Sequence, residues 1–192
     1  MDGCNQMFNI PNSLSALRLL LAPVMLYFAW RGSAQPFIVL LGVALLSDLL
    51  DGFLARLLNQ VTEFGARLDS WGDFATYWVM TIGVWLLWPE VIEREAFFIT
   101  VIGVSYFLPR LVGVVKFQRF ILSYHTWGAK ASAALISSSV FVMVAFEVVW
   151  PFHLAVVFFV LAELEEAAIT LVLRSWRSDI ASLWHLRREG EG

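Results

Sequence analysis

The pattern of apolar and polar positions along the chain predicts a bundle of membrane-spanning helices. A transmembrane helix needs about 20 predominantly apolar residues. Windows of about 19 residues reveal six such stretches, at about 13–31, 36–58, 65–88, 96–118, 126–149 and 152–173. Short segments with glycine, proline or charge separate them, among them Arg31-Gly32-Ser33 and Pro89-Glu90. We therefore expect an all-α integral membrane protein of six transmembrane helices that form one domain over residues 1–192.

One charged residue interrupts the first apolar stretch. Arg18 lies inside this stretch, and no basic segment precedes it. A secretory signal peptide, by contrast, has a basic segment ahead of its apolar core. We therefore expect the stretch to be retained as the first helix.

The distribution of lysine and arginine predicts the orientation in the membrane, because basic residues concentrate in cytoplasmic segments near helix ends. One side of the predicted bundle has only Arg31 and Arg94. The other side has Arg56, Arg67, Lys116, Arg119, Arg174, Arg177, Arg187 and Arg188. Both termini are therefore expected to be cytoplasmic.

Composition agrees with a membrane protein and narrows the possible functions. Hydrophobic residues make up 59% of the chain and charged residues 15%, against roughly 45–50% and 25% in soluble domains. The net charge of −3 is too small to favour electrostatic binding of nucleic acid, so no nucleic-acid partner is expected. Cys4 is the single cysteine, which excludes an intramolecular disulfide and a zinc cluster of thiolates.

Two of the predicted spans contain aspartates at helical spacing. One face of the second span has Asp48, Asp51, Gly52, Ala55 and Arg56. One face of the third span has Gly65, Asp69, Gly72 and Asp73. The short connection makes the two helices antiparallel neighbours, so the faces should meet and bring four carboxylates into one pocket. A charge inside a membrane helix costs about 2.5 to 3.5 kcal/mol on insertion scales, so the aspartates require compensation.

Divalent cations are one such compensation, because carboxylates at close quarters repel one another unless protons or cations neutralise them. A ligand set of oxygens alone suits Mg²⁺ or Mn²⁺, which bind carboxylates together with substrate phosphates. Gly52 and Gly65 would let a bulky ligand approach, and Arg56 suits phosphate oxygens. These features predict a site for two metal ions and a diphosphate. The competing interpretation is structural, with Arg56 and Arg67 pairing two aspartates and the glycines serving close helix packing.

The same residues form a pattern that resembles a known signature. Asp48-Leu-Leu-Asp51-Gly52-Phe-Leu-Ala55-Arg56, then eight residues, then Gly65-Ala-Arg-Leu-Asp69-Ser-Trp-Gly-Asp73 matches the signature of the CDP-alcohol phosphotransferases at every position. The segment Asn9-Ile10-Pro11-Asn12-Ser13-Leu14-Ser15 is similar to the phosphatidylglycerophosphate and cardiolipin synthase branch. The resemblance implies an enzyme that transfers a phosphatidyl group from CDP-diacylglycerol to an alcohol and releases CMP.

The resemblance also implies roles for individual residues. Asp48 and Asp69 would bind both metal ions, Asp51 the first ion, and Asp73 the second while also acting as general base. The implied contacts of the cytidine diphosphate are Pro11, Asn12, Ser13, Leu14, Gly52, Ala55, Arg56, Thr62 and Gly65. The family also implies a homodimer in membrane lipid, here the cytoplasmic (inner) membrane of a bacterium, with the active site open to the cytoplasm.

The acceptor alcohol is less constrained by the sequence. Arg110 and Lys130 are further basic residues in predicted spans and would hold an acceptor phosphate, which favours glycerol 3-phosphate. Ser70 and Phe74 stand where the phosphatidylglycerophosphate synthase branch usually has proline and lysine. Inositol, inositol phosphate, serine or another alcohol therefore stay as alternatives.

Three glutamates in the last predicted span are unusual for a membrane helix: Glu163, Glu165 and Glu166. Glu163 and Glu166 lie three residues apart on one helical face. We expect them to pair with Lys130 or Arg110, or else to help recognise the acceptor.

A function of another class would also use intramembrane acids. A cation transporter or channel could conduct ions along the carboxylates. The chain lacks the paired interrupted helices and inverted repeats that are typical of many transporters, so we rank this class second.

Overall fold

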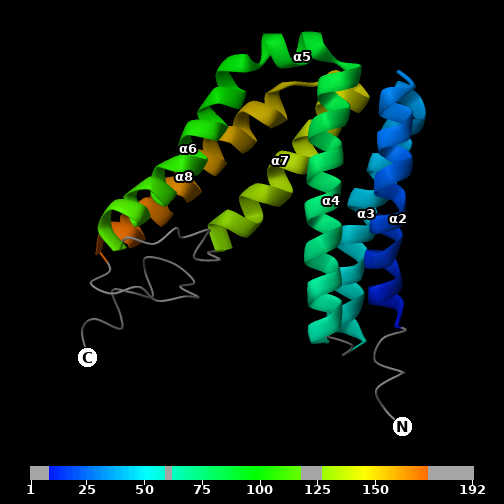
Figure 1. Cartoon of the computed structure of the whole chain (residues 1–192), viewed down its shortest axis with the longest axis horizontal. Coiled ribbons are helices and arrows are strands. Elements are labelled where there is room, and N and C mark those ends of the chain that lie inside the picture. The colour runs from blue at the N-terminus through cyan, green and yellow to red at the C-terminus, as the bar shows by residue number, and fades with distance from the viewer. Residues whose placement is uncertain (1–8, 59–61, 118–126, 173–192) are drawn as a thin grey trace. The chain divides into compact units, whose positions relative to one another are not determined.

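The computed structural model describes residues 9–58, 62–117 and 127–172, and they are helical apart from short connections (Figure 1). The helices are α2 (Ile10–Trp30), α3 (Ala34–Leu57), α4 (Glu63–Leu87), α5 (Pro89–Arg94), α6 (Ala96–Phe117), α7 (Trp127–Phe146) and α8 (Trp150–Val172). The all-α prediction is therefore confirmed for the described part of the chain. The chain divides into two compact units, Met1–Glu93 and Arg94–Gly192.

Each of the six predicted spans coincides with a long helix, whereas α5 is a short helix at a predicted separator. Four helices in the described ranges are long and apolar enough to cross a membrane: Ile10–Trp30, Ala34–Ala55, Ala96–Lys116 and Trp127–Phe146. Helices α4 and α8 have sufficient length, but α4 contains aspartates and α8 contains three glutamates. The count of six spans and the cytoplasmic termini stay predictions. Arg119 and the four C-terminal arginines of the orientation argument lie outside the described residues.

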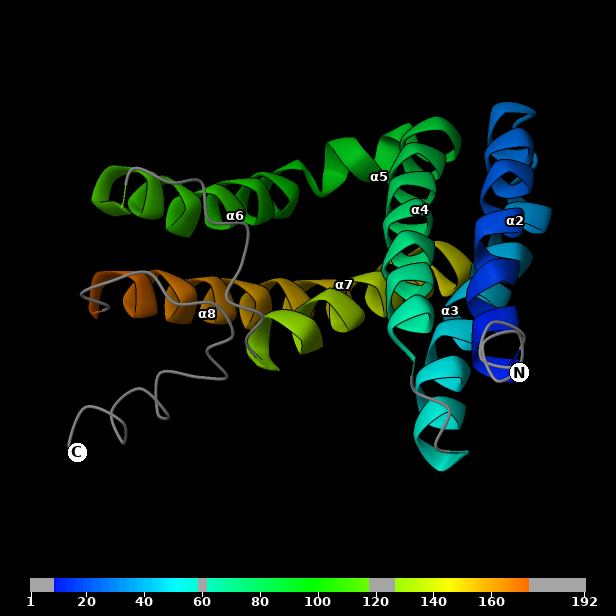
Figure 2. The same ribbon diagram turned by 60° about the horizontal axis from the view of Figure 1, so that its bottom comes forward.

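Helices α2, α3 and α4 lie side by side in the first unit (Figures 1 and 2). Helix α2 packs extensively against both α3 and α4, whereas α3 and α4 share a smaller contact. Met25, Phe37 and Leu41 are fully or almost fully buried between the helices. A Cβ atom on Gly83 would overlap the ring of Phe37, so this position needs glycine for α3 to approach α4.

Local sequence signals explain where the helices of this unit begin and end. The side chain of Asn9 caps α2 by accepting a hydrogen bond from the backbone N–H of Asn12 at 2.9 Å. Thr62 caps α4 in the same way, with the N–H of Gly65 at 3.0 Å. Between α2 and α3 the chain reverses at Gly32, whose φ of 69° is a left-handed conformation that glycine adopts without steric cost.

In the second unit, α8 packs against both α6 and α7. Val156 and Ile169 of α8 are buried in this packing. The amine of Lys116 on α6 donates hydrogen bonds to the backbone carbonyls of Thr170, at 3.1 Å, and Leu171. Lys116 thereby places a positive charge on the carbonyl end of α8, where a cation is stabilising.

Glu95 joins the start of α6 to the start of α8 within the same unit. Its buried carboxylate accepts a hydrogen bond from Nε of Arg94 at 2.9 Å and lies 2.7 Å from Nε2 of His153. The His153 ring stacks on Phe98, with ring centres 3.9 Å apart. The carboxylate and the aromatic stack together tie the two helix starts to each other.

Candidate active site

Four aspartates from α3 and α4 converge on Arg18 of α2. Nη1 of Arg18 donates to the carboxylates of Asp48 and Asp73, the second at 2.8 Å. Nη2 donates to the carboxylates of Asp51, at 2.6 Å, and Asp69. The two aspartate faces therefore come together as predicted, but a side chain of a third helix joins them.

The cation that pairs the aspartates differs from the one considered in the structural interpretation of the sequence. That interpretation assigned the pairing to Arg56 and Arg67, whereas all four aspartates form ion pairs with Arg18. The side chain of Arg67 is exposed, and that of Arg56 lies outside the described part of the structure. The sequence predicts no partner for Arg18 and marks it only as a sign that the first stretch is retained as a helix. Its position inside an apolar stretch was the available signal, because an intramembrane arginine requires an acidic partner.

Burial divides the cluster into one inner carboxylate and three outer ones. The side chain of Asp51 is 5% exposed, and it also accepts a hydrogen bond from the Ser15 hydroxyl at 2.9 Å. The side chains of Asp48, Asp69 and Asp73 are between 35% and 44% exposed. The cluster is thus anchored on one side and accessible on the other.

Two glycines of α4 allow α2 to approach the cluster. A Cβ atom on Gly72 would lie 3.3 Å from Nε of Arg18 and 3.4 Å from the carbonyl oxygen of Ser15. A Cβ atom on Gly65 would overlap the side-chain oxygen of Asn12. These glycines therefore serve close helix packing, and Gly72 makes room for the Arg18 side chain beside the carboxylates.

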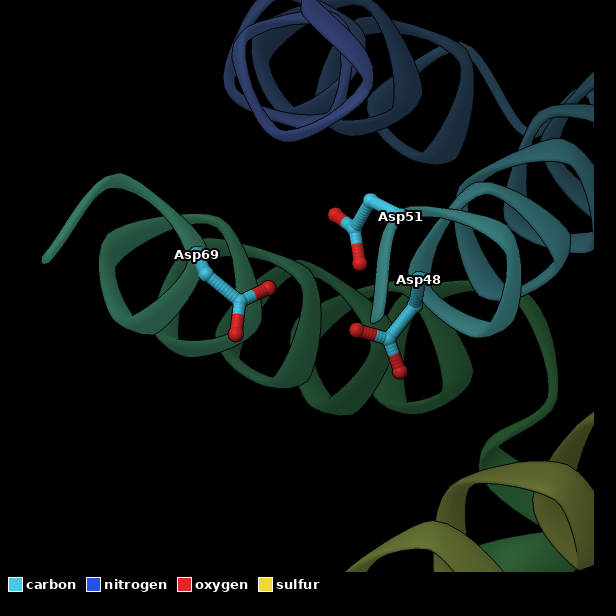
Figure 3. A group of neighbouring side chains, drawn as sticks. All are labelled: Asp48, Asp51 and Asp69. Carbon is cyan, nitrogen blue, oxygen red and sulfur yellow. The ribbon is translucent and has the colours of Figure 1, made fainter. Parts of the chain in front are cut away.

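The arrangement of three of the aspartates is one that could hold a hard divalent cation. One oxygen from each of Asp48, Asp51 and Asp69 lies within 4.8 Å of the other two. Figure 3 shows these three carboxylates pointing into a common space, two from α3 and one from α4. Asp73 lies outside this group of three but shares Nη1 of Arg18 with Asp48. Four ionised carboxylates exceed the single positive charge of Arg18 by three, so a further cation would be stabilised here.

The residues expected to bind the cytidine diphosphate include a group at the starts of α2 and α4. Pro11 and Asn12 are buried in the first turn of α2, and Ser13 beside them is exposed. Asn12 lies against Gly65, which in turn follows the capping residue Thr62. The structure thereby brings together parts of two segments that are 50 residues apart in the sequence. Leu14, Gly52 and Ala55 also lie in described helical turns, and the nucleotide contacts of all these residues stay predictions.

Arg110, a predicted acceptor contact in the second unit, is buried and already partnered. Its Nη1 donates to the carboxylate of Glu163 and to the backbone carbonyl of Tyr106, the latter at 2.7 Å. The guanidinium carbon also lies 3.8 Å from the centre of the Tyr106 ring. The pair with Glu163 is one of those that the sequence predicted. Lys130, the other predicted acceptor contact, is exposed.

Comparison with known proteins identifies the family. The family model described as CDP-alcohol phosphatidyltransferase matches residues 8–177. Three relatives carry the name CDP-diacylglycerol–glycerol-3-phosphate 3-phosphatidyltransferase. The protein of Wigglesworthia glossinidia brevipalpis is 31% identical over 155 residues, which cover 74% of this chain and 77% of the relative. The protein of Cereibacter sphaeroides is 35% identical over 57% of this chain and 54% of the relative. The protein of Aquifex aeolicus is 46% identical over 34% of this chain and 36% of the relative. The predicted resemblance is confirmed, and this chain belongs to the CDP-alcohol phosphatidyltransferase family.

Proposed function

We propose that this chain transfers a phosphatidyl group from CDP-diacylglycerol to glycerol 3-phosphate and releases CMP. The observation that carries the proposal is the convergence of four aspartates, three of them with oxygens within 4.8 Å, at the position of the family signature. The relatives whose names specify glycerol 3-phosphate support this alcohol as the acceptor.

The aspartates would hold two Mg²⁺ or Mn²⁺ ions. Asp48 and Asp69 would contact both ions, Asp51 the first and Asp73 the second. When bound, the ions supply positive charge to the diphosphate oxygens as the phosphoanhydride breaks. The oxygen-only ligand set and the unbalanced negative charge of the cluster support this assignment.

Asp73 is the proposed general base. The acceptor hydroxyl oxygen attacks the phosphorus that carries the diacylglycerol, and its proton passes to the Asp73 carboxylate. The bond between that phosphorus and the bridging oxygen breaks, and CMP leaves with the oxygen. The Asp73 side chain is 35% exposed, so an acceptor can reach it. The nearby hydroxyl of Ser15 is buried and donates to Asp51, which favours direct displacement over a covalent serine intermediate.

The cytidine diphosphate would bind beside the starts of α2 and α4. Asn12, Thr62 and Gly65 lie together there, and Gly65 precedes Asp69 by about one helical turn. A nucleotide at this end would therefore place its diphosphate next to the aspartates. Arg56 would contribute a positive charge to the phosphate oxygens.

Lys130 is the stronger of the two proposed acceptor contacts, because Arg110 is buried and paired with Glu163 while Lys130 is exposed. Loss of one charge-assisted phosphate contact weakens binding by about 10- to 150-fold. Lys130→Ala should therefore raise the acceptor KM by about this factor and leave the donor KM near its original value. An unchanged acceptor KM would remove Lys130 from the acceptor site.

The reaction can be tested with the purified full chain in lipid-detergent micelles. CDP-diacylglycerol is supplied with glycerol 3-phosphate, inositol or serine, and both CMP release and the product lipid are measured. We expect turnover with glycerol 3-phosphate that requires Mg²⁺ or Mn²⁺ and is lost on chelation. Turnover with another alcohol in place of glycerol 3-phosphate would show that the proposed acceptor is wrong and that the proposed reaction is right. Absence of CMP release with every alcohol would overturn the proposal, and cation flux without CMP release would favour the transporter class.

We also place the chain in the cytoplasmic membrane of a bacterium as a homodimer, with the aspartate cluster open to the cytoplasm. The support for the orientation is the concentration of basic residues on one side of the predicted bundle. Labelling of single cysteines from either side of the membrane tests the orientation, and cross-linking in native membranes tests the dimer.

A further inference from the structure

We propose that Arg18 is the resident counter-ion of the aspartate cluster and that divalent ions displace it when they bind. In this view Arg18 holds the four carboxylates together in the metal-free protein and lowers their affinity for metal. The inference rests on the proposed metal site, and it assigns a positioning role to a residue of α2 that lies outside the aspartate signature.

Arg18 and a metal ion would need the same carboxylates. Arg18 Nη2 lies 2.6 Å from Oδ2 of Asp51, and Nη1 lies 2.8 Å from Oδ1 of Asp73. Asp48 and Asp69 accept hydrogen bonds from the same two nitrogens. Mg²⁺ binds carboxylate oxygens at about 2.0–2.1 Å. An ion held between these oxygens at that distance would lie close to the guanidinium nitrogens, and its charge would repel theirs, so the two occupants compete for the same carboxylates.

The charge of Arg18 does not match the charge of the aspartate cluster. One guanidinium faces four carboxylates, which leaves three negative charges unbalanced when all are ionised. Arg18 therefore reduces the repulsion between α3 and α4 without removing it. A divalent ion neutralises more of the cluster than Arg18 does, which gives metal binding its advantage in the exchange.

The hydrogen bonding of Arg18 is itself incomplete. The residue is 1% exposed, and its Nε is one of two buried side-chain polar atoms in the described ranges without a hydrogen-bond partner. Its contacts with carboxylates are all made by the two Nη atoms. The missing side chain of Gly72 leaves space beside Nε. The carboxylate contacts of Arg18 are thus confined to the two nitrogens that a bound ion would displace.

The affinity of the purified full chain for Mn²⁺ tests the displacement, with free Mn²⁺ measured by electron paramagnetic resonance. Arg18→Gln removes the competing charge and Arg18→Lys keeps it with a single donor group. Arg67→Gln is the matched control, because Arg67 is an exposed arginine of the same unit. We expect Arg18→Gln to bind Mn²⁺ at least about 10- to 150-fold more tightly, the factor for one of the four charge-assisted contacts that no longer have to be broken. Arg18→Lys should fall between Arg18→Gln and the wild type, and Arg67→Gln should match the wild type.

Thermal unfolding provides a second readout that does not require activity. Arg18→Gln should lower Tm strongly in EDTA and much less in saturating Mn²⁺, because a ligand that binds the folded state more tightly stabilises it more. If Arg18→Gln can be purified only with Mn²⁺, Arg18→Lys supplies the comparison in EDTA.

The possible failures can be told apart. If both Arg18 variants bind Mn²⁺ no more tightly than the wild type does, Arg18 does not compete with the metal. That result would overturn the displacement and leave the proposed metal site standing. Wild-type protein that binds no Mn²⁺, or binds it equally well after Asp48→Asn, would overturn the metal site and with it the inference.

Discussion

Arg18 in the first unit and Arg110 in the second are both buried arginines of apolar helices, and they have very different partners. Each is at most 5% exposed, and each leaves its Nε without a hydrogen-bond partner in the described structure. Arg110 forms an ion pair with Glu163 and contacts the Tyr106 carbonyl and ring. Arg18 forms ion pairs with four aspartates.

The difference separates an ion pair of one arginine and one carboxylate from the proposed ligand site. The pair of Arg110 and Glu163 matches one guanidinium with one carboxylate and joins α6 to α8, and the buried Glu166 lies near enough to Glu163 to repel its charge. The cluster around Arg18 is unbalanced, and three of its carboxylates are partly accessible. Burial of charge therefore does not distinguish the two arginines, whereas the unbalanced and accessible charge around Arg18 supports the proposed site.

The largest expected effect is a loss of turnover when an aspartate of the cluster around Arg18 is replaced. Asp73→Asn removes the proposed base while preserving shape, and we expect turnover to fall by about 10² to 10⁴-fold with donor binding largely intact. Asp48→Asn should weaken metal and donor binding together. Steady-state kinetics and donor binding distinguish the two variants. Equal loss of donor affinity in both, with normal turnover at saturating donor, would contradict the assigned roles.

Substitutions in the ion pair of Arg110 and Glu163 should change the stability of the fold. Arg110→Met alone leaves the Glu163 carboxylate without its arginine and should cost about 3–5 kcal/mol. Arg110→Met combined with Glu163→Leu should recover most of that loss, since an apolar pair can replace a buried ion pair. Unfolding in detergent measures both variants. A double variant that is as unstable as the single one, or that loses Mn²⁺ binding, would contradict a purely structural pair.

Helix positions and aspartates were predictable from the sequence, but the partner of the aspartates was not. Apolar stretches mark the helices because lipid selects for them, and Asp48 and Asp73 stand out because charge is costly there. Helical spacing also places each aspartate on a face of its own helix. It says nothing of how α2 is rotated against α3 and α4, so the position of Arg18 required the structure. Arg110 and Glu163 were predictable only as one of several possible pairs.

The pH dependence of the second unit offers a milder test. Burial opposes ionisation of Glu95, but hydrogen bonds from His153 and Arg94 outweigh it and lower the pKa of the carboxyl below its usual 4.5. Ionised Glu95 therefore stabilises the fold above about pH 4.5, and this contribution is lost as the pH falls through the lowered pKa.

Glu95→Gln should remove this dependence and cost about 1.5 kcal/mol near neutral pH, a value at the lower end for hydrogen bonds to charged groups because Arg94 and His153 are partly exposed. Thermal unfolding between pH 6 and 3.5 provides the comparison. If Tm falls with pH equally in Glu95→Gln and in the wild type, ionised Glu95 does not provide the pH-dependent stability.

The smallest effect concerns a position far from either arginine in the sequence. Gly32→Ala places a side chain in the left-handed turn between α2 and α3, where no atom lies within 4 Å of the added Cβ. The cost is therefore conformational, about 1 kcal/mol. Tm should fall slightly while Mn²⁺ affinity stays at the wild-type value. A change in metal affinity would show that the cluster responds to general loss of stability, which would weaken the interpretation of every other variant.

The stoichiometry of Mn²⁺ binding tests most directly whether the unbalanced cluster is the functional site. Wild-type protein and Glu163→Gln should each bind two ions per chain, whereas Asp48→Asn should lose them, because Asp48 is proposed to contact both. Loss of Mn²⁺ in Glu163→Gln, or full binding in Asp48→Asn, would contradict the assignment of the metal site to the four aspartates around Arg18.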